Sequence, residues 1–246
     1  MLEKCGSQTL EPGAQPREVL TALVDSMELA GLDCNFVLSP RDYNLYLIEA
    51  PAVEAAELRS AVRWKIKDLL DMPVEDAVID IFPVPEDAFQ GRSKMLYAVA
   101  AQKSRIEFVI ELVNRSGLNL SVIDVPEMAL LNVASEFLED RNGLAFMDLR
   151  RAGGTMNLSR GGQLYLTRKI NTSLGDEFHG LGDAAGSTGA GDSAQMVASL
   201  SEAMSVQVGV LDFANAMDMA EGLDAAKQHM CAVVIGAAMR QNRAGS

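Results

Sequence analysis

Histidine, cysteine and aromatic residues are all scarce in this chain of 246 residues, which contains two histidines, three cysteines and 5 % aromatic side chains. His179 and His229 are far apart in the sequence, and Cys5, Cys34 and Cys231 lack the short spacings of metal ligands. Neither a structural zinc site nor a disulfide-rich scaffold is therefore expected. A small and odd number of cysteines instead indicates a reducing compartment such as the cytoplasm.

The motifs of several large enzyme classes are also missing. The sequence has no GxxxxGKS/T phosphate loop, no GxGxxG after a predicted strand, no GxSxG and no HExxH. Acidic pairs such as Glu139-Asp140 and Asp176-Glu177 could form a catalytic dyad, but solvated surface carboxylates are far more common. No motif therefore predicts a hydrolase, and two histidines make a Ser/His/Asp triad an unfavoured hypothesis.

Positive charge is in short supply, because 34 acidic residues outnumber 21 lysines and arginines and give a net charge of −13. Such a chain repels phosphate backbones and anionic lipid headgroups, which argues against nucleic acid and direct membrane docking. No apolar run approaches the roughly 18 residues of a membrane span, and the N-terminal MLEKCGSQTLEPG lacks the apolar core of a signal peptide. We expect a cytoplasmic protein without direct membrane insertion.

Helical and extended patterns alternate along the chain. Helices are predicted at 17–29, 51–70, 104–114, 126–138, 193–204 and 225–240, and strands at 35–38, 44–49, 77–82, 95–101, 118–124, 144–148, 155–159, 163–168 and 206–211. The glycine-rich segment 180–191 is expected to be a flexible linker or a long loop. This order predicts an α/β fold in two lobes that divide near Arg141, one over residues 1–141 and one over residues 142–246.

The predicted helix 51–70 carries a basic stripe, formed by Arg59, Arg63 and Lys67 at intervals of four residues. Trp64, the only tryptophan, lies on the side opposite the apolar face. Because tryptophan and arginine dominate binding hot spots, the stripe and Trp64 could form a partner-binding surface. The alternative is a solvated helix face whose tryptophan packs under a neighbouring strand, and this is the more common arrangement.

A second candidate site follows the predicted strand 144–148. Asp148 ends this strand, and after Arg150 comes a candidate phosphate turn, Gly153-Gly154-Thr155. An acid at the end of a strand, followed by a glycine turn, can hold a metal-bound phosphate through backbone N–H groups. The alternative is an ordinary hairpin turn in which glycine supplies a positive φ, and on this motif alone the ordinary turn is favoured.

A longer stretch carries a resemblance to a known family. It runs from Ala50 to Asp80 and includes the sequence Arg-Trp-Lys-Ile-Lys-Asp at 63–68, its most specific part. Further matching segments are 97–101, 122–130, 162–168 and 235–240, so that the match covers most of residues 16–172 and a weaker tail. The chain resembles the MshI family of mannose-sensitive haemagglutinin (MSHA) pilus biogenesis proteins, which are relatives of the PilM pilus assembly proteins.

This resemblance implies an actin-like (ribonuclease H-like) two-lobed ATPase fold, with an α/β subdomain inserted in the first lobe. It also implies a place at the cytoplasmic face of the inner membrane, in the assembly platform of a type IV pilus, where the family binds the cytoplasmic tail of a bitopic membrane partner. In the actin-like fold an Asp-x-Gly hairpin would form the first phosphate element, and this sequence starts downstream of it. The second element would fall at Asp148, with Arg150 where a glycine is expected.

Two hypotheses of function follow from the resemblance. In the first, the chain is a non-catalytic scaffold or adaptor that binds its membrane partner through Trp64 and the basic stripe. In the second, it is a nucleotide-dependent ATPase that acts as a switch in pilus assembly, in which Asp148 positions Mg²⁺ of Mg-ATP and the candidate phosphate turn approaches the phosphates. The arginine at position 150 favours the scaffold.

Overall fold

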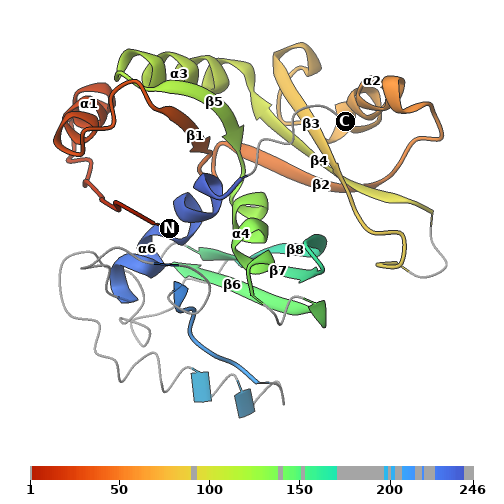
Figure 1. Ribbon diagram of the computed structural model, residues 1–246. Helices are drawn as coiled ribbons and strands as arrows, with labels where there is room; N and C mark the ends of the chain where they lie inside the picture. Colours follow the sequence, from red (N-terminus) through yellow and green to blue (C-terminus); the bar gives the residue numbers. More distant parts are fainter. Residues whose placement is uncertain are drawn as a thin grey trace.

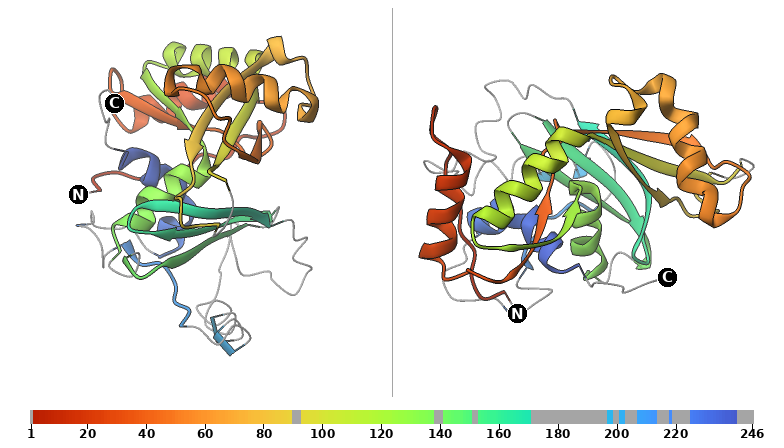
Figure 2. Two further views of the ribbon diagram at one scale, coloured as in Figure 1. Left: turned by 90° about the vertical axis from the view of Figure 1, so that its right-hand side faces the viewer. Right: turned by 90° about the horizontal axis from the view of Figure 1, so that it is seen from above.

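The computed structural model describes residues 2–89, 93–137, 141–150, 153–170, 197–198, 201–202, 207–213, 218 and 225–240. Within this part of the chain, three small sheets pack against helices (Figures 1 and 2). The mixed α/β architecture expected from the sequence is therefore confirmed. The division into lobes near Arg141 remains a prediction.

A short parallel sheet is formed by β1 (Asp33–Val37) and β5 (Asn119–Asp124), which pair from end to end. Beside it, α1 (Pro16–Ser26) packs against α3 (Lys103–Arg115), as Figure 1 shows. α3 turns Val109 and Val113 into the core, because residues four apart lie on one helix face. Two residues beyond α3, Gly117 adopts a φ of +88°, which glycine tolerates at the end of a helix.

An antiparallel unit is inserted between β1 and β5. Its strand order is β2 (Tyr43–Glu49), β4 (Met95–Gln102), β3 (Ala77–Pro83), and α2 (Ala55–Ile66) covers one face, followed by the 3₁₀ helices η1 (Lys67–Leu69) and η2 (Val74–Asp76). Val62 and Ile66 of α2 are fully buried with Ala98 and Ala100 of β4. These small alanines allow close packing. Figure 2 shows the unit at one end of the molecule.

The third sheet is an antiparallel meander of β6 (Leu144–Arg150), β7 (Gly153–Arg160) and β8 (Gln163–Ile170). Gly161 and Gly162 join β7 to β8 with φ values of +59° and +74°, which a tight hairpin turn requires. α4 (Pro126–Ser135) lies on this sheet (Figure 1). The contact is partly polar, because buried Asn157 of β7 donates a hydrogen bond to the carbonyl of Glu127 at 2.8 Å.

α6 (Ala225–Ala238) crosses α4 at very short distance. A Cβ atom on Gly236 would lie 2.0 Å from the carbonyl oxygen of Ala129, so glycine is required where the two helices meet. The interface buries an apolar cluster formed by Leu130, Val133, Phe146, Phe213, Cys231, Ala232 and Ile235. A disulfide joins Cys231 of this cluster to Cys5, a pairing that the sparse cysteine content does not predict.

Most predicted elements are present with shifted ends. The helix predicted at 17–29 stops at Ser26, and Glu28 beyond it has a φ of +58°, which breaks a helix. The helix predicted at 51–70 is α2 followed by η1. The strand predicted at 206–211 is wrong for residues 207–211, which form no strand. An alternating apolar run becomes a strand only where a partner strand pairs with it. The segment 180–191 lies outside the described residues.

Candidate functional site

Trp64 lies on the outer face of α2 and is 62 % exposed. The ammonium group of Lys67 lies 5.9 Å from the centroid of its ring, within the range of a cation–π contact. The prediction that this tryptophan packs under a strand is wrong. α2 meets the sheet through Val62 and Ile66, and a residue halfway between them in the sequence points to the opposite side of the helix.

The two arginines of the basic stripe are held by the protein itself. Arg63 donates hydrogen bonds to the carbonyls of Ala77, at 3.2 Å, and of Val74, and so ties α2 to η2 and β3. Arg59 forms a salt bridge of 2.9 Å with Asp80 between two exposed side chains. Of the four residues of the predicted surface, Arg63 is thus bound within the protein and Arg59 remains exposed beside Asp80. Trp64 and Lys67 form an exposed pair, which we call the α2 patch.

The candidate phosphate turn is part of strand β7, and the structure places its residues beside Asp148 in the sheet. Thr155 pairs with Asp148 on β6 and with Lys169 on β8, so the three side chains form a row on one face. Gly154 pairs with both neighbouring strands, and Gly153 pairs with Arg150. The backbone of Gly154 and Thr155 therefore belongs to the sheet ladder, unlike the exposed N–H groups of a phosphate loop.

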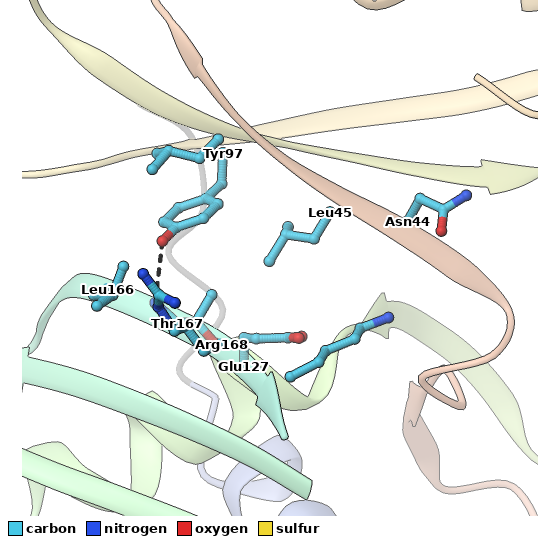
Figure 3. A pocket seen from close by; sticks show the side chains of 9 residues that line it. Asn44, Leu45, Tyr97, Glu127, Leu166, Thr167 and Arg168 are labelled. Atoms are coloured by element: carbon cyan, nitrogen blue, oxygen red, sulfur yellow. Dashed lines mark hydrogen bonds between the residues drawn. The ribbon is translucent and has the colours of Figure 1, made fainter. Parts of the chain in front are cut away.

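Lys169, at one end of this row, borders a cavity of about 380 Å³ that the sequence did not reveal (Figure 3). The cavity lies between the uncovered face of the β2-β4-β3 sheet and the pair formed by α4 and β8. Its lining residues are Asn44, Leu45, Leu47, Tyr97, Glu127, Leu166, Thr167, Arg168 and Lys169. Apolar side chains from β2 thus face polar side chains from α4 and β8, a combination typical of ligand sites.

Glu127, in the first turn of α4, supplies the buried carboxyl group of this cavity. Its side chain is fully buried, and Oε2 accepts a hydrogen bond of 2.6 Å from the hydroxyl of Tyr43. Oε1 is buried and has no hydrogen-bond partner among the described residues. Burial raises the pKa of Glu127, because a carboxylate loses its hydration there.

Lys169 connects β8 to the segment around β2. Its ammonium group donates to the carbonyl of Pro40 at 2.8 Å and to that of Tyr43 at 3.4 Å, and it lies 4.5 Å from the centroid of the Tyr43 ring. Burial lowers the pKa of Lys169, and the charge of Glu127 opposes this shift. Glu127, Tyr43 and Lys169 form a polar cluster that holds three elements together, and we call it the Glu127 cluster.

Thr167 and Tyr97 form the second polar contact of the cavity. The backbone N–H of Thr167 donates to the Tyr97 hydroxyl at 3.0 Å, as the dashed line in Figure 3 marks. The Thr167 hydroxyl oxygen is buried and has no partner among the described residues. Glu127 and Thr167, each with one covered oxygen that has no partner among the described residues, therefore line the cavity opposite Leu45 and Leu47. Such a wall suits an elongated ligand with polar and aliphatic groups.

Metal sites and membrane-spanning helices are two further features on which the structure bears. In the described ranges, no group of three or more histidine, cysteine, aspartate or glutamate side chains is arranged to hold a metal ion. None of the helices placed by the structure has both the length and the apolarity that a membrane crossing requires. His179 and the acidic pairs Glu139-Asp140 and Asp176-Glu177 lie outside the described residues.

No protein-family model matches the sequence, and no curated protein matches it. Solved structures do resemble it. One is a chain of a "PilM-PilN type IV pilus biogenesis complex", with 20 % identity and a TM-score of 0.60 over 81 % of this chain and 64 % of that chain. This protein thus spans less than two thirds of the length of that relative.

Two other solved structures are more distant. The cytoplasmic domain of EpsL, an inner-membrane component of the type II secretion system of Vibrio cholerae, has 12 % identity and a TM-score of 0.45 over 70 % of this chain and 63 % of that one. A Bacteroides thetaiotaomicron protein with an actin-like ATPase fold and unknown function has 10 % identity and a TM-score of 0.34 over 76 % of this chain and 63 % of that one. The TM-score of 0.60 establishes a common fold with the pilus complex chain, and the actin-like α/β fold expected from the sequence is confirmed.

Proposed function

We propose that this chain is a scaffold of the MshI type in the inner-membrane assembly platform of a type IV (MSHA-type) pilus. In this role it lies at the cytoplasmic face of the membrane and binds the cytoplasmic tail of a bitopic pilus assembly protein. The observation that carries the proposal is the fold that 81 % of this chain shares with a chain of the PilM–PilN complex. Binding a partner requires no catalytic group.

The α2 patch is the first place where the partner could bind. An exposed tryptophan beside a lysine offers a large apolar surface next to a positive charge, and it stands out on a chain with a net charge of −13. Tryptophan at the centre of an interface commonly contributes about 2 kcal/mol or more to binding. An acidic tail with an aliphatic or aromatic residue would complement Trp64 and Lys67.

The cavity beside the Glu127 cluster is the second place, on the opposite face of the same sheet. An extended segment of chain carries N–H donors and carbonyl acceptors for the polar side chains of β8 that line the cavity, such as Arg168. An aliphatic side chain of the same segment would contact Leu45 and Leu47. The two places can be separated by experiment, because the α2 patch is on the outer face of α2, the cavity is on the other face of the sheet, and no residue belongs to both.

Site-specific photocrosslinking tests the proposal and locates the surface. A photoreactive phenylalanine analogue is placed at Trp64 in the α2 patch, at Leu47 beside the cavity, and at Phe108 on α3 as a control with similar exposure to Leu47. Cells of the source bacterium are irradiated, and the crosslinked products are identified by mass spectrometry. We expect one single-span inner-membrane protein, crosslinked through its cytoplasmic tail, at position 64.

The possible outcomes are distinct. The same membrane protein at position 47 and its absence at position 64 would retain the scaffold and move the binding site to the cavity. If the single-span membrane protein were crosslinked neither at position 64 nor at position 47, the scaffold proposal would be contradicted. Equal crosslinking at position 108 would show non-specific proximity. The double variant Trp64→Ala/Lys67→Glu, compared with Phe108→Ala/Lys103→Glu on α3, then measures the contribution of the α2 patch.

A nucleotide-dependent switch is the alternative function, and the row Asp148–Thr155–Lys169 is the observation that favours it. In this alternative, Asp148 positions Mg²⁺ and Gly153 and Gly154 approach a phosphate. Calorimetric titration with Mg-ATP tests it directly. Binding in the micromolar range, about 8 kcal/mol, that is lost in a folded Asp148→Ala variant would make the switch the primary function. A flat titration of the folded protein would retain the scaffold alone.

A further inference from the structure

A disulfide links two residues near opposite ends of the chain. Cys5 and Cys231 are 226 positions apart, and the bond attaches the N-terminal segment to α6. Cys34, the third cysteine, is free and half-buried. The pairing has no part in the proposed partner surface or in the Glu127 cluster. It therefore requires a separate explanation.

The two sulfur atoms lie in different surroundings. Cys231 is 2 % exposed and packs in the cluster of Leu130, Val133 and Ile235 between α4 and α6. Cys5 is only half-buried, and the residues on both sides of it are exposed. Cys5 is therefore the more accessible of the two to a dissolved thiol, whereas Cys231 is covered by side chains.

Apart from the packing of Leu2 against the cluster between α4 and α6, the described contacts of the N-terminal segment are mostly polar and exposed. The backbone N–H of Leu2 donates to the carbonyl of Asp218 at 2.9 Å. The ammonium group of Lys4 contacts the Met27 carbonyl at 2.9 Å and Glu28 at 3.3 Å, but the side chains of Lys4 and Glu28 are 49 % and 86 % exposed. Exposed contacts of this kind contribute little. The disulfide is thus the covalent connection between this segment and α6.

We propose that the Cys5–Cys231 pair is a redox-operated clamp, opened and closed by thiol–disulfide exchange with glutathione. On opening, a glutathione thiolate attacks the Cys5 sulfur, the Cys5–Cys231 bond breaks, and Cys231 leaves as a thiolate that takes up a proton. A second glutathione thiolate attacks the glutathione sulfur of the mixed disulfide and releases Cys5 as a thiol and glutathione disulfide. Closing is the reverse, with glutathione disulfide as the oxidant.

The surroundings determine the direction of attack and the speed of opening. Cys5 is more exposed than Cys231, so the mixed disulfide forms on Cys5 and not on Cys231. The leaving group is the thiolate of Cys231, which lies in an apolar cluster. Because such surroundings stabilise a thiolate poorly, Cys231 leaves slowly. The clamp therefore responds slowly to a change in glutathione and holds its state through brief fluctuations.

Thiol counting of the full chain tests whether the clamp operates. The protein is equilibrated with glutathione buffers of increasing disulfide content, alkylated with iodoacetamide under denaturing conditions, and analysed by peptide mass spectrometry. We expect alkylation of all three cysteines in the reducing buffers and of Cys34 alone in the oxidising buffers. Three alkylated cysteines at every ratio, or a Cys5–Cys231 bond that persists at every ratio, would overturn the proposal.

A pair of single-cysteine variants tests the mechanism. Cys231→Ala leaves the accessible Cys5, which we expect to carry one glutathione after incubation with glutathione disulfide. Cys5→Ser leaves the covered Cys231, which we expect to remain unmodified in the folded protein. The opposite pattern, or equal modification of both, would contradict attack at Cys5. Cys34→Ser is the control, because it removes a thiol outside the clamp.

Hydrogen exchange then shows whether the bond controls the segment. With the clamp closed, we expect backbone amides of residues 2–6 to exchange about tenfold more slowly than with the clamp open, since opening removes the main restraint on the segment. The Cys5→Ser variant should exchange at the open rate in either buffer. Equal exchange in oxidised and reduced protein would show that the bond does not control the segment.

Discussion

The two faces of the β2-β4-β3 sheet offer opposite kinds of surface to a partner. On one side, α2 covers the sheet and presents Trp64 and Lys67 to solvent. On the other side, β2 borders a cavity whose polar wall holds a fully buried carboxyl group, that of Glu127. Water surrounds the groups of the first surface, so their mutual attraction is weak, whereas burial makes each hydrogen bond of the second expensive to lose.

Removing the buried carboxyl group should have the largest effect. In Glu127→Ala, the Tyr43 hydroxyl loses its acceptor and a void opens beside Lys169. We expect the free energy of unfolding to fall by about 2–4 kcal/mol, measured by urea denaturation. The matched control is Glu57→Ala, an exposed glutamate in the first turn of α2, which should change stability by less than about 0.5 kcal/mol. Equal losses in the two variants would remove the contrast between the two faces.

Two tyrosines on the same strand give a finer test. Tyr43→Phe leaves Oε2 of Glu127 without its donor in a buried site, so we expect a loss of about 1–3 kcal/mol. Tyr46 points to the α2 side, and its hydroxyl donates to the Leu69 carbonyl at 3.0 Å in an exposed position. Tyr46→Phe should therefore cost less, about 0.5–1 kcal/mol. A larger loss of stability for Tyr46→Phe than for Tyr43→Phe, in thermal or urea denaturation, would contradict the conclusion that the buried hydrogen bond of Tyr43 contributes more.

The pH dependence of stability should also distinguish the buried site. The pKa of Glu127 is raised in the folded state, so the folded protein binds this proton more tightly than the unfolded chain. Its contribution to stability is complete below the unfolded pKa, near 4.3, and is lost as the pH rises through the folded pKa. Glu127→Gln cannot ionise. We therefore expect the stability of the wild type relative to this variant to decline as the pH rises from about 4.

Urea denaturation of both proteins from pH 4 to pH 8 provides the measurement. Glu57→Gln, an exposed substitution of the same type, is the control and should show no such trend. A stability difference between wild type and Glu127→Gln that stays constant with pH would mean that Glu127 has the same proton affinity in both states. That result would contradict the role of burial in this cluster.

The same contrast explains what could be predicted from the sequence. Trp64 and Lys67 are three residues apart, so helix periodicity alone places them side by side, and most helices and strands follow from equally local patterns. The Glu127 cluster joins three segments whose pairing depends on packing. In the sequence, Glu127 follows a proline at a helix start, where an acidic residue is normally a solvated partner of the helix dipole. No local signal marks it as buried.

Arg63 shows a further limit of local patterns. Its position in the basic stripe predicted an exposed cation, but its guanidinium reaches two carbonyls of the chain that follows α2. Periodicity gives the direction in which a side chain leaves its helix. It does not give the position of the next segment, and for Arg63 that segment contains the hydrogen-bond acceptors.

The smallest effect on stability is expected for Trp64→Ala. The ring is largely exposed, and its contact with Lys67 contributes at most about 1 kcal/mol, so we expect a change in unfolding free energy of about 0.5 kcal/mol or less. Phe108→Ala on α3 is the matched control. If the α2 patch binds the partner, Trp64→Ala should abolish the crosslinked product seen with a photoreactive group at Lys67 while the fold remains intact. A stable variant that still forms this product in full would show that the Trp64 side chain is not required for binding of the partner.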